Sequence, residues 1–118
     1  MVKLADQAAK ALAANGVEAE IIDPRTLVPL DEETILASIA KTRRLVIVDE
    51  ARDRCSAASQ IAAVAADSGF GLLKAPVKRV TVPNVCMPYA PVLERSVYPS
   101  SERIVSTVLA LVSNQEAI

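Results

Sequence analysis

The sequence predicts an α/β fold in which helices cover both faces of a mainly parallel sheet, giving three α/β/α layers. Three observations support this fold class. Helical and strand-like patterns alternate along the chain, which is typical of parallel sheets. Residues 45–48 are continuously apolar, as expected of a strand that is buried on both faces. The core must be aliphatic, because 52% of the residues are hydrophobic and only 3% are aromatic.

Composition bounds the size and the class of the protein. The 118 residues fit a single domain, 1–118, with an ordered core of about 2–113. The net charge of −1 provides no basic surface, so we expect no nucleic-acid partner. No apolar run approaches the ~20 residues of a membrane span, so we expect no membrane partner and a cytoplasmic location. The chain has no histidine, which removes the commonest general base and most zinc sites.

The first part of the chain predicts a helix, a strand and a second helix. Residues 2–15 are rich in alanine with one apolar face, and Gly16 provides a left-handed stop. Residues 17–23 predict a short strand that ends at Pro24, because proline has no backbone N–H to donate to a neighbouring strand. Asp31 is a good N-cap for the next helix, and the two glutamates after it suit the helix dipole.

The middle of the chain predicts two further strands around one helix. The apolar run 45–48 predicts the second strand, and a polar loop follows it. Ser56 is a plausible N-cap for a helix that ends near Asp67. Residues 69–76 predict a loop, and the alternation over 77–82 predicts a third strand with one more polar side.

The last part of the chain predicts a long loop and a final helix. Four of the seven prolines fall within residues 83–99, which predicts a segment without regular structure, and such long loops are often functional. Ser100 or Ser101 then caps a helix that continues to about residue 113. The tail, 114–118, is expected to fray.

Only three strands are predicted, and the chain begins with a helix. A three-stranded sheet with both faces covered is small, which suggests that a strand preceding Met1 has been lost or belongs to a longer parent protein. The unpaired sheet edge that results predicts weak self-association.

Two acidic residues at a strand end have both a chemical and a structural interpretation. Asp49 and Glu50 lie where ligands bind in open α/β sheets, which suggests metal or acid/base chemistry. They can equally belong to a loop that caps the next helix and pairs with Arg52 or Arg54. We favour the structural role, because the chain offers neither a histidine partner nor a glycine-rich loop.

Arg25 and Cys55 have two interpretations as well. Arg25 can bind a carboxylate or phosphate of a ligand, or it can stabilise its own loop through Asp23 or the acidic residues 31–33. We favour the structural role, partly because two prolines already stiffen that loop. Cys55 can be a nucleophile at a helix N-terminus, or a small thiol packed at an interface, and the absence of a base favours the second. Cys55 and Cys86 are expected to be reduced thiols.

Three blocks of the sequence carry a recognisable pattern. They are IDPRTLVPLDEETI (22–35), RRLVIVDEARDRCSAASQIAAVAA (43–66) and APVKRVTVPNVCMPYAPVLERSVYPSSERIV (75–105). The blocks resemble the beta subunits of thiamine-diphosphate-dependent 2-oxo acid and acetoin dehydrogenases, with order and spacing that agree over roughly the whole chain. The stretch VDEARDRCSAAS is most similar to the acetoin-cleaving branch.

The resemblance implies a fold and a set of partners. The matching region is the C-terminal domain of the beta subunit, which is shared with transketolase and has a central strand before the first helix. Thiamine diphosphate and Mg are implied to bind elsewhere, between the alpha subunit and the N-terminal domain of beta. This fragment is then expected to hold no catalytic residue, cofactor or metal. The implied partners are a second beta subunit, the alpha subunit and the subunit-binding domain of the acyltransferase core.

Few residues can be carried over from the family. Asp23, Arg25 and Thr26 match the D-R-T of its motif, and Pro29 and Asp31 match the end of the same motif. Together they are expected to form a structural connection.

The proline-rich segment is apolar for a loop, so it can either wrap the core or form a surface for a partner. The subunit contacts that the resemblance implies for this domain favour the interface. It matches the family pattern at Tyr89 and Pro91. Two residues depart from the family: Lys74 stands where many relatives have Asp or Glu in a region used for core docking, and Asn84 stands where relatives often have Asp or His. The candidate interface residues are Lys74, Met87, Tyr89, Pro91 and Tyr98.

These observations favour a non-catalytic assembly and docking domain of a beta subunit, inactive alone, in an enzyme that passes an acyl group to lipoamide. The alternative is a free-standing regulatory or ligand-binding α/β domain. A receiver domain would need clustered acids at the end of its first strand and a late lysine, which the sequence does not offer. A hydrolase is disfavoured, because both G-x-S-x-G and histidine are absent.

Overall fold

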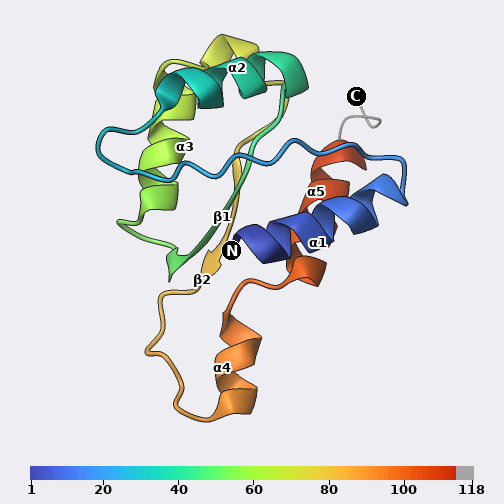
Figure 1. The fold of residues 1–118 in the computed structure, drawn as a ribbon. Helices are drawn as coiled ribbons and strands as arrows, with labels where there is room; N and C mark the ends of the chain where they lie inside the picture. Colours follow the sequence, from blue (N-terminus) through green and yellow to red (C-terminus); the bar gives the residue numbers. More distant parts are fainter. Residues whose placement is uncertain (114–118) are drawn as a thin grey trace.

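The computed structural model describes residues 1–113 of the chain, and the predicted fraying of 114–118 lies outside the described residues. Figure 1 shows a two-stranded sheet in the middle of the molecule with a pair of helices on each side. This arrangement confirms the predicted three-layer α/β fold. The elements are α1 (Val2–Ala13), α2 (Glu32–Thr42), β1 (Val46–Arg52), α3 (Ala57–Asp67), η1 (Phe70–Leu72), β2 (Lys78–Val82), α4 (Pro91–Val97) and α5 (Ser101–Ser113).

The two strands run parallel and pair along one edge of β1. Val48 lies opposite Val80, and the next pair is Arg52 with Val82, so three residues of β1 face a single residue of β2. Such a bulge bends the strand and increases its twist. Because the two strands are parallel, their carboxyl ends lie together at the same end of the sheet, where polar side chains collect.

Each face of the sheet has its own hydrophobic cluster. The first cluster lies where α1 and α5 pack on the sheet, and it is centred on Val80 of β2 and Ile104 of α5. The second cluster lies under α2 and α3 and is centred on Ile35, Ile39 and Ala65. The buried hydrophobic side chains of both clusters are aliphatic, as the composition predicts.

Hydrogen bonds confirm the predicted helix starts. Asp31 Oδ1 accepts from the backbone N–H of Thr34 at 3.0 Å. Ser56 and Ser100 each accept from the backbone N–H three residues further along, at 3.3 and 3.2 Å. These acceptors serve first-turn N–H groups that have no partner within the helix. Gly16 has a φ of 76°, the left-handed conformation predicted for the end of the first helix.

The predicted strand at 17–23 is wrong. After its first residue the segment makes no backbone hydrogen bond within the described part of the chain. A strand requires a neighbouring backbone, and β1 pairs only with β2 among the described residues. Side chains hold the segment instead: Glu20 accepts from Ser38 Oγ at 3.1 Å and lies 3.5 Å from Lys41 Nζ, while Ile22 packs on the second cluster.

Two segments predicted as loops contain short helices. The prediction that 83–99 lacks regular structure is wrong, because α4 begins there with Pro91 at its first position, where a missing N–H removes no helical bond. The predicted loop 69–76 includes the 3₁₀ turn η1. β1 also continues beyond its predicted end to Arg52, since its last residue still pairs with β2.

Candidate functional site

Residues 83–99 form an arm that leaves the end of β2 and returns to the start of α5, and we call it the proline arm. Figure 1 shows the arm, with α4, projecting from the end of the molecule away from α2 and α3. Exposed apolar surface on a small domain is typical of a contact site. The exposed large apolar residues of the arm are Val85, Met87, Tyr89, Val92 and Leu93.

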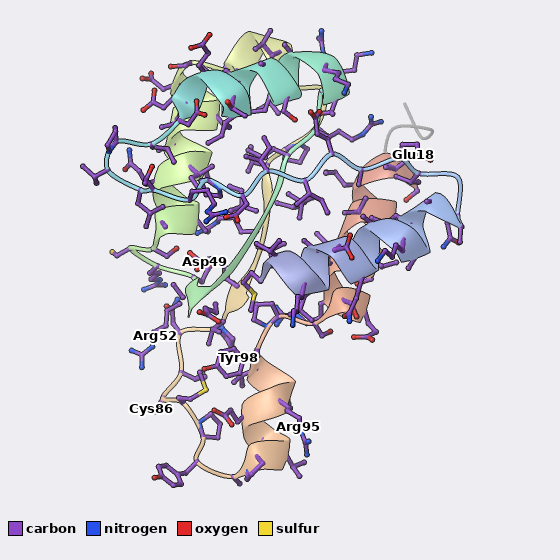
Figure 2. The ribbon with its side chains drawn as sticks, in the orientation of Figure 1. Glu18, Asp49, Arg52, Cys86, Arg95 and Tyr98 are labelled. Atoms are coloured by element: carbon purple, nitrogen blue, oxygen red, sulfur yellow. The ribbon has the colours of Figure 1, made fainter. Side chains whose placement is uncertain are left out.

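The structure divides the five predicted interface residues between two places. Met87, Tyr89 and Pro91 are exposed on the outer part of the proline arm. Tyr98 is half-buried where the arm returns to the body of the domain (Figure 2). Lys74 is exposed in the loop before β2, at the opposite end of that strand from the arm. The arm therefore gathers four of the five, and Lys74 belongs to a different surface.

Arg103, in the first turn of α5, holds the proline arm at its root. Its Nη1 donates to the carbonyl oxygens of Tyr98 at 3.2 Å and Val97 at 3.4 Å. Its Nη2 donates to the carbonyl oxygen of Thr81 at 3.1 Å, at the strand end from which the arm leaves. The planar guanidinium can serve several acceptors at once, so one side chain ties the two ends of the arm together.

The sequence contained a signal for Arg103 that we missed. The first turn of a helix favours acidic side chains and disfavours cations, because backbone N–H groups point outward there. Glu102 obeys this preference in α5, whereas Arg103 does not. A cation in such a position indicates that its side chain has partners outside its own helix.

A second polar network joins the end of β1 to β2 and α3. Arg79 Nη2 lies 3.1 Å from Asp53 Oδ1, and Arg79 Nη1 donates to the Asp53 carbonyl at 2.6 Å and to Ser59 Oγ at 2.9 Å. The hydroxyl of Thr81, a residue only 6% exposed, donates to Asp53 Oδ1 at 3.2 Å. These groups satisfy one another, so the network braces the strand ends.

Asp49, one of the chemical candidates in the sequence, caps a helix. Its Oδ1 accepts from the N–H of Ala51 at 3.0 Å, and its Oδ2 accepts from the N–H of Ala58 at 3.2 Å. Asp49 lies within β1, and Figure 2 labels it near the loop that leads to α3. These contacts support the structural role, although Asp49 belongs to the strand rather than to a loop, and the expected ion pair with Arg52 or Arg54 does not occur among the described residues.

The block that contains Asp23 and Arg25 is a local turn. Arg25 Nε lies 3.8 Å from Asp23 Oδ2 with both side chains exposed, so the pair contributes at most about 1 kcal/mol. Thr26 Oγ1 donates to the carbonyl oxygen of Pro29 at 2.9 Å, which closes the turn just before Asp31. These contacts stay within the loop, in agreement with the structural interpretation of Arg25.

Asp31 gives the start of α2 a pH dependence. The hydroxyl and the N–H of Thr34 both donate to the Asp31 carboxylate and hold the pKa of that carboxyl below its ordinary value. The stabilisation is therefore fully present above the unfolded-state pKa and is lost as pH falls through the lower, folded-state pKa. We expect Asp31→Asn, which keeps an acceptor but does not titrate, to weaken the loss of thermal stability between neutral pH and about pH 3.

Asp31→Ala is the matched control, because it removes the acceptor and should lower Tm at neutral pH as well. Thermal melts of the three proteins at both pH values measure these effects. An unchanged pH dependence in Asp31→Asn would show that the cap does not titrate as described.

Cys55 and Cys86 are both free and exposed. This agrees with the predicted reduced thiols. Cys55 lies where the chain turns with a φ of 53° just before α3, and its packing at an interface stays a prediction. Within residues 1–113, no group of three or more His, Cys, Asp or Glu side chains is arranged to hold a metal ion. In the same range no helix combines the length and the apolar character needed to cross a membrane.

The sequence matches known proteins over most of its length. The beta subunit of acetoin:2,6-dichlorophenolindophenol oxidoreductase from Bacillus subtilis is 52% identical over 110 residues, which cover 93% of this chain and 32% of that protein. The Cupriavidus necator protein of the same name is 48% identical over 104 residues, 88% of this chain and 31% of that protein. Mitochondrial pyruvate dehydrogenase E1 component subunit beta-1 from Arabidopsis thaliana is 44% identical over 105 residues, which cover 89% of this chain and 29% of that protein.

The chain spans about a third of the length of these curated relatives. Residues 1–104 match the family described as "Transketolase, C-terminal domain", so the match extends from α1 into the first turn of α5. The predicted resemblance is confirmed by both findings. The chain belongs to the transketolase C-terminal domain family.

Proposed function

We propose that this chain is the assembly and docking domain of the beta subunit of a thiamine-diphosphate-dependent acetoin or 2-oxo acid dehydrogenase. The whole enzyme would transfer an acyl group to lipoamide, while this domain would hold a second beta subunit and the alpha subunit in place. The names of the acetoin and pyruvate dehydrogenase relatives support the enzyme class. The higher identity to the acetoin relative, 52% against 44%, favours the acetoin branch.

The proline arm is the observation that carries the assembly role. Val92 and Leu93 on α4 are 70% and 56% exposed, and Tyr89 lies just before that helix. A cluster of aliphatic and aromatic side chains is typical of the centre of a protein interface. Because Arg103 already fixes the root of the arm, a partner would spend less binding free energy on ordering it.

We expect the double substitution Val92→Asp and Leu93→Asp to weaken concentration-dependent self-association of the chain. Two carboxylates without partners would be strongly unfavourable at a buried interface. Sedimentation velocity over a range of protein concentrations measures the effect. The matched control is Val28→Asp, since Val28 is 93% exposed in the turn before α2. Self-association of unchanged strength in the double variant would exclude the arm as the contact surface.

Thiamine diphosphate and Mg are implied for the whole enzyme by the family resemblance, which places them outside this domain. The chain has only three glycines and no glycine-rich loop to cradle a diphosphate. We expect calorimetric titration of the chain with thiamine diphosphate and Mg to give only the heat of dilution. Tight binding would overturn the assignment of the chemistry to other parts of the enzyme.

Docking of the acyltransferase core and a cytoplasmic location belong to the same proposal. Lys74 is exposed, but it has the opposite charge to the acid that the resemblance leads us to expect there. A docking salt bridge at this position would need an acidic partner residue. The cytoplasmic location stays a prediction, because the Arabidopsis thaliana relative is named as a mitochondrial protein.

A further inference from the structure

A polar hollow of about 520 Å³ lies at the root of the proline arm. Its walls come from the loop after β1, the end of β2, both ends of the arm and the first turn of α5. It therefore opens outside the carboxyl ends of the two parallel strands, which is where ligands bind in open α/β sheets. We call it the root hollow.

Most polar groups that line the root hollow already have partners. The hydroxyl of Thr81 donates to Asp53 Oδ1 at 3.2 Å, and the hydroxyl of Ser96 donates to the carbonyl oxygen of Leu93 at 2.6 Å. Arg103 carries five N–H groups and makes three hydrogen bonds. At least two of its N–H groups, including the one on Nε, thus have no partner among the described residues.

Asn84 adds a second set of donors to the root hollow. The backbone N–H of Arg54 donates to Asn84 Oδ1 at 3.4 Å, which identifies the oxygen end of this amide. The NH₂ group at the other end has no partner within residues 1–113. A guanidinium and an amide that line the same hollow can donate to a single anionic group.

The charges around the root hollow favour an anion. The Asp53 carboxylate is balanced by Arg79, whose Nη2 lies 3.1 Å from Asp53 Oδ1. Arg103 makes no ion pair in the part of the chain that the structure describes, so its positive charge is not balanced. The planar fork of a guanidinium matches the two oxygen atoms of a carboxylate.

We propose that the root hollow binds a small organic carboxylate, whose oxygen atoms accept from the Arg103 guanidinium and the Asn84 amide. Pro83 and Val97 line the same hollow, so they would contact a short hydrocarbon chain attached to the carboxylate. Because Asn84 and Val97 lie near the two ends of the arm and Arg103 lies on α5, a bound carboxylate would also hold the arm against the domain. The inference does not depend on the proposed function.

The test is a titration of the whole chain with sodium propionate, followed by amide NMR spectra. We expect saturable shifts of the Asn84 side-chain amide and of the backbone amides of Val97 and Arg103, with a Kd in the millimolar range. Propionamide is the matched control probe, because it has the same size without the charge, and it should give no saturable shift. Sodium chloride at the same ionic strength controls for screening.

Two amide-to-acid variants place the binding in the root hollow. Asn84→Asp keeps the size of the side chain and an acceptor for the Arg54 N–H, but it replaces two donors by a negative charge. It should weaken propionate binding by at least roughly tenfold. Gln7→Glu makes the same chemical change at an exposed position of α1 outside the hollow, and it should change binding by no more than about twofold.

Three results would overturn the proposal. Equal binding of propionamide would show that the negative charge is not recognised. An unchanged affinity for propionate in Asn84→Asp, with an unchanged thermal melt, would exclude the root hollow as the site. Tighter binding of inorganic phosphate than of propionate, with shifts at the same residues, would assign the hollow to tetrahedral anions instead of carboxylates.

Discussion

Replacing Ile39 by alanine should lower the free energy of unfolding by about 2–5 kcal/mol. Ile39 is 1% exposed and lies in the second cluster, between α2 and α3. The substitution removes three buried carbon atoms and leaves a cavity, and a small domain has little stability to lose. Urea denaturation followed by circular dichroism gives the free energy directly.

Val92→Ala is the control for this experiment. It removes apolar carbon atoms from a helix as well, but Val92 is 70% exposed, so we expect a change within about 0.5 kcal/mol. A loss of similar size in both variants would mean that the second cluster does not stabilise the domain as its burial indicates.

Replacing Arg103 by methionine should release the proline arm. The variant keeps an apolar stem of similar length but loses the three hydrogen bonds to the carbonyl oxygens of Thr81, Val97 and Tyr98. The Thr81 carbonyl lies in a partly buried contact, so we expect a loss of about 1–3 kcal/mol. The larger effect should be local, as faster cleavage within residues 83–99 during limited proteolysis.

Arg95→Met is the matched control, because Arg95 lies on α4 and points away from the body of the domain (Figure 2). It should leave both stability and the cleavage pattern unchanged. Arg103→Lys separates charge from geometry, since an ammonium group cannot reproduce the fork of a guanidinium. If lysine restored full protection of the arm, charge at the helix start would explain the anchoring.

Local sequence signals predicted the helix boundaries well. Asp31, Ser56 and Ser100 each act as the N-cap that their residue type suggests, and Gly16 takes the left-handed conformation expected of it. These features depend on a few neighbouring residues, so a single sequence contains what is needed to predict them.

The errors arose where structure depends on distant partners. Residues 17–23 have the composition of a strand, but strand formation requires another backbone in register, and the described chain supplies none. The opposite error occurred at α4, where four prolines suggested a loop although Pro91 starts a helix. Proline excludes the interior of a helix but favours its first position, so the count of prolines was a poor guide.

The candidate site was predictable only in part. The apolar character of residues 83–99 indicated an exposed surface, and the structure places Met87 and Tyr89 on it. Lys74 could not be located relative to that surface, because its distance from the arm depends on the direction of β2. Arg103 was missed because its partners are backbone carbonyl groups, which leave no trace in the identity of the residues that carry them.

The neighbouring residues Arg103 and Ile104 connect the arm to the interior of the domain. Arg103 holds the root of the proline arm, while Ile104, the next residue of α5, is buried in the first cluster. A partner that binds only the anchored form of the arm would shift the folding equilibrium of the domain by mass action. The resistance of the folded chain to heat and proteolysis would then rise with the concentration of that partner.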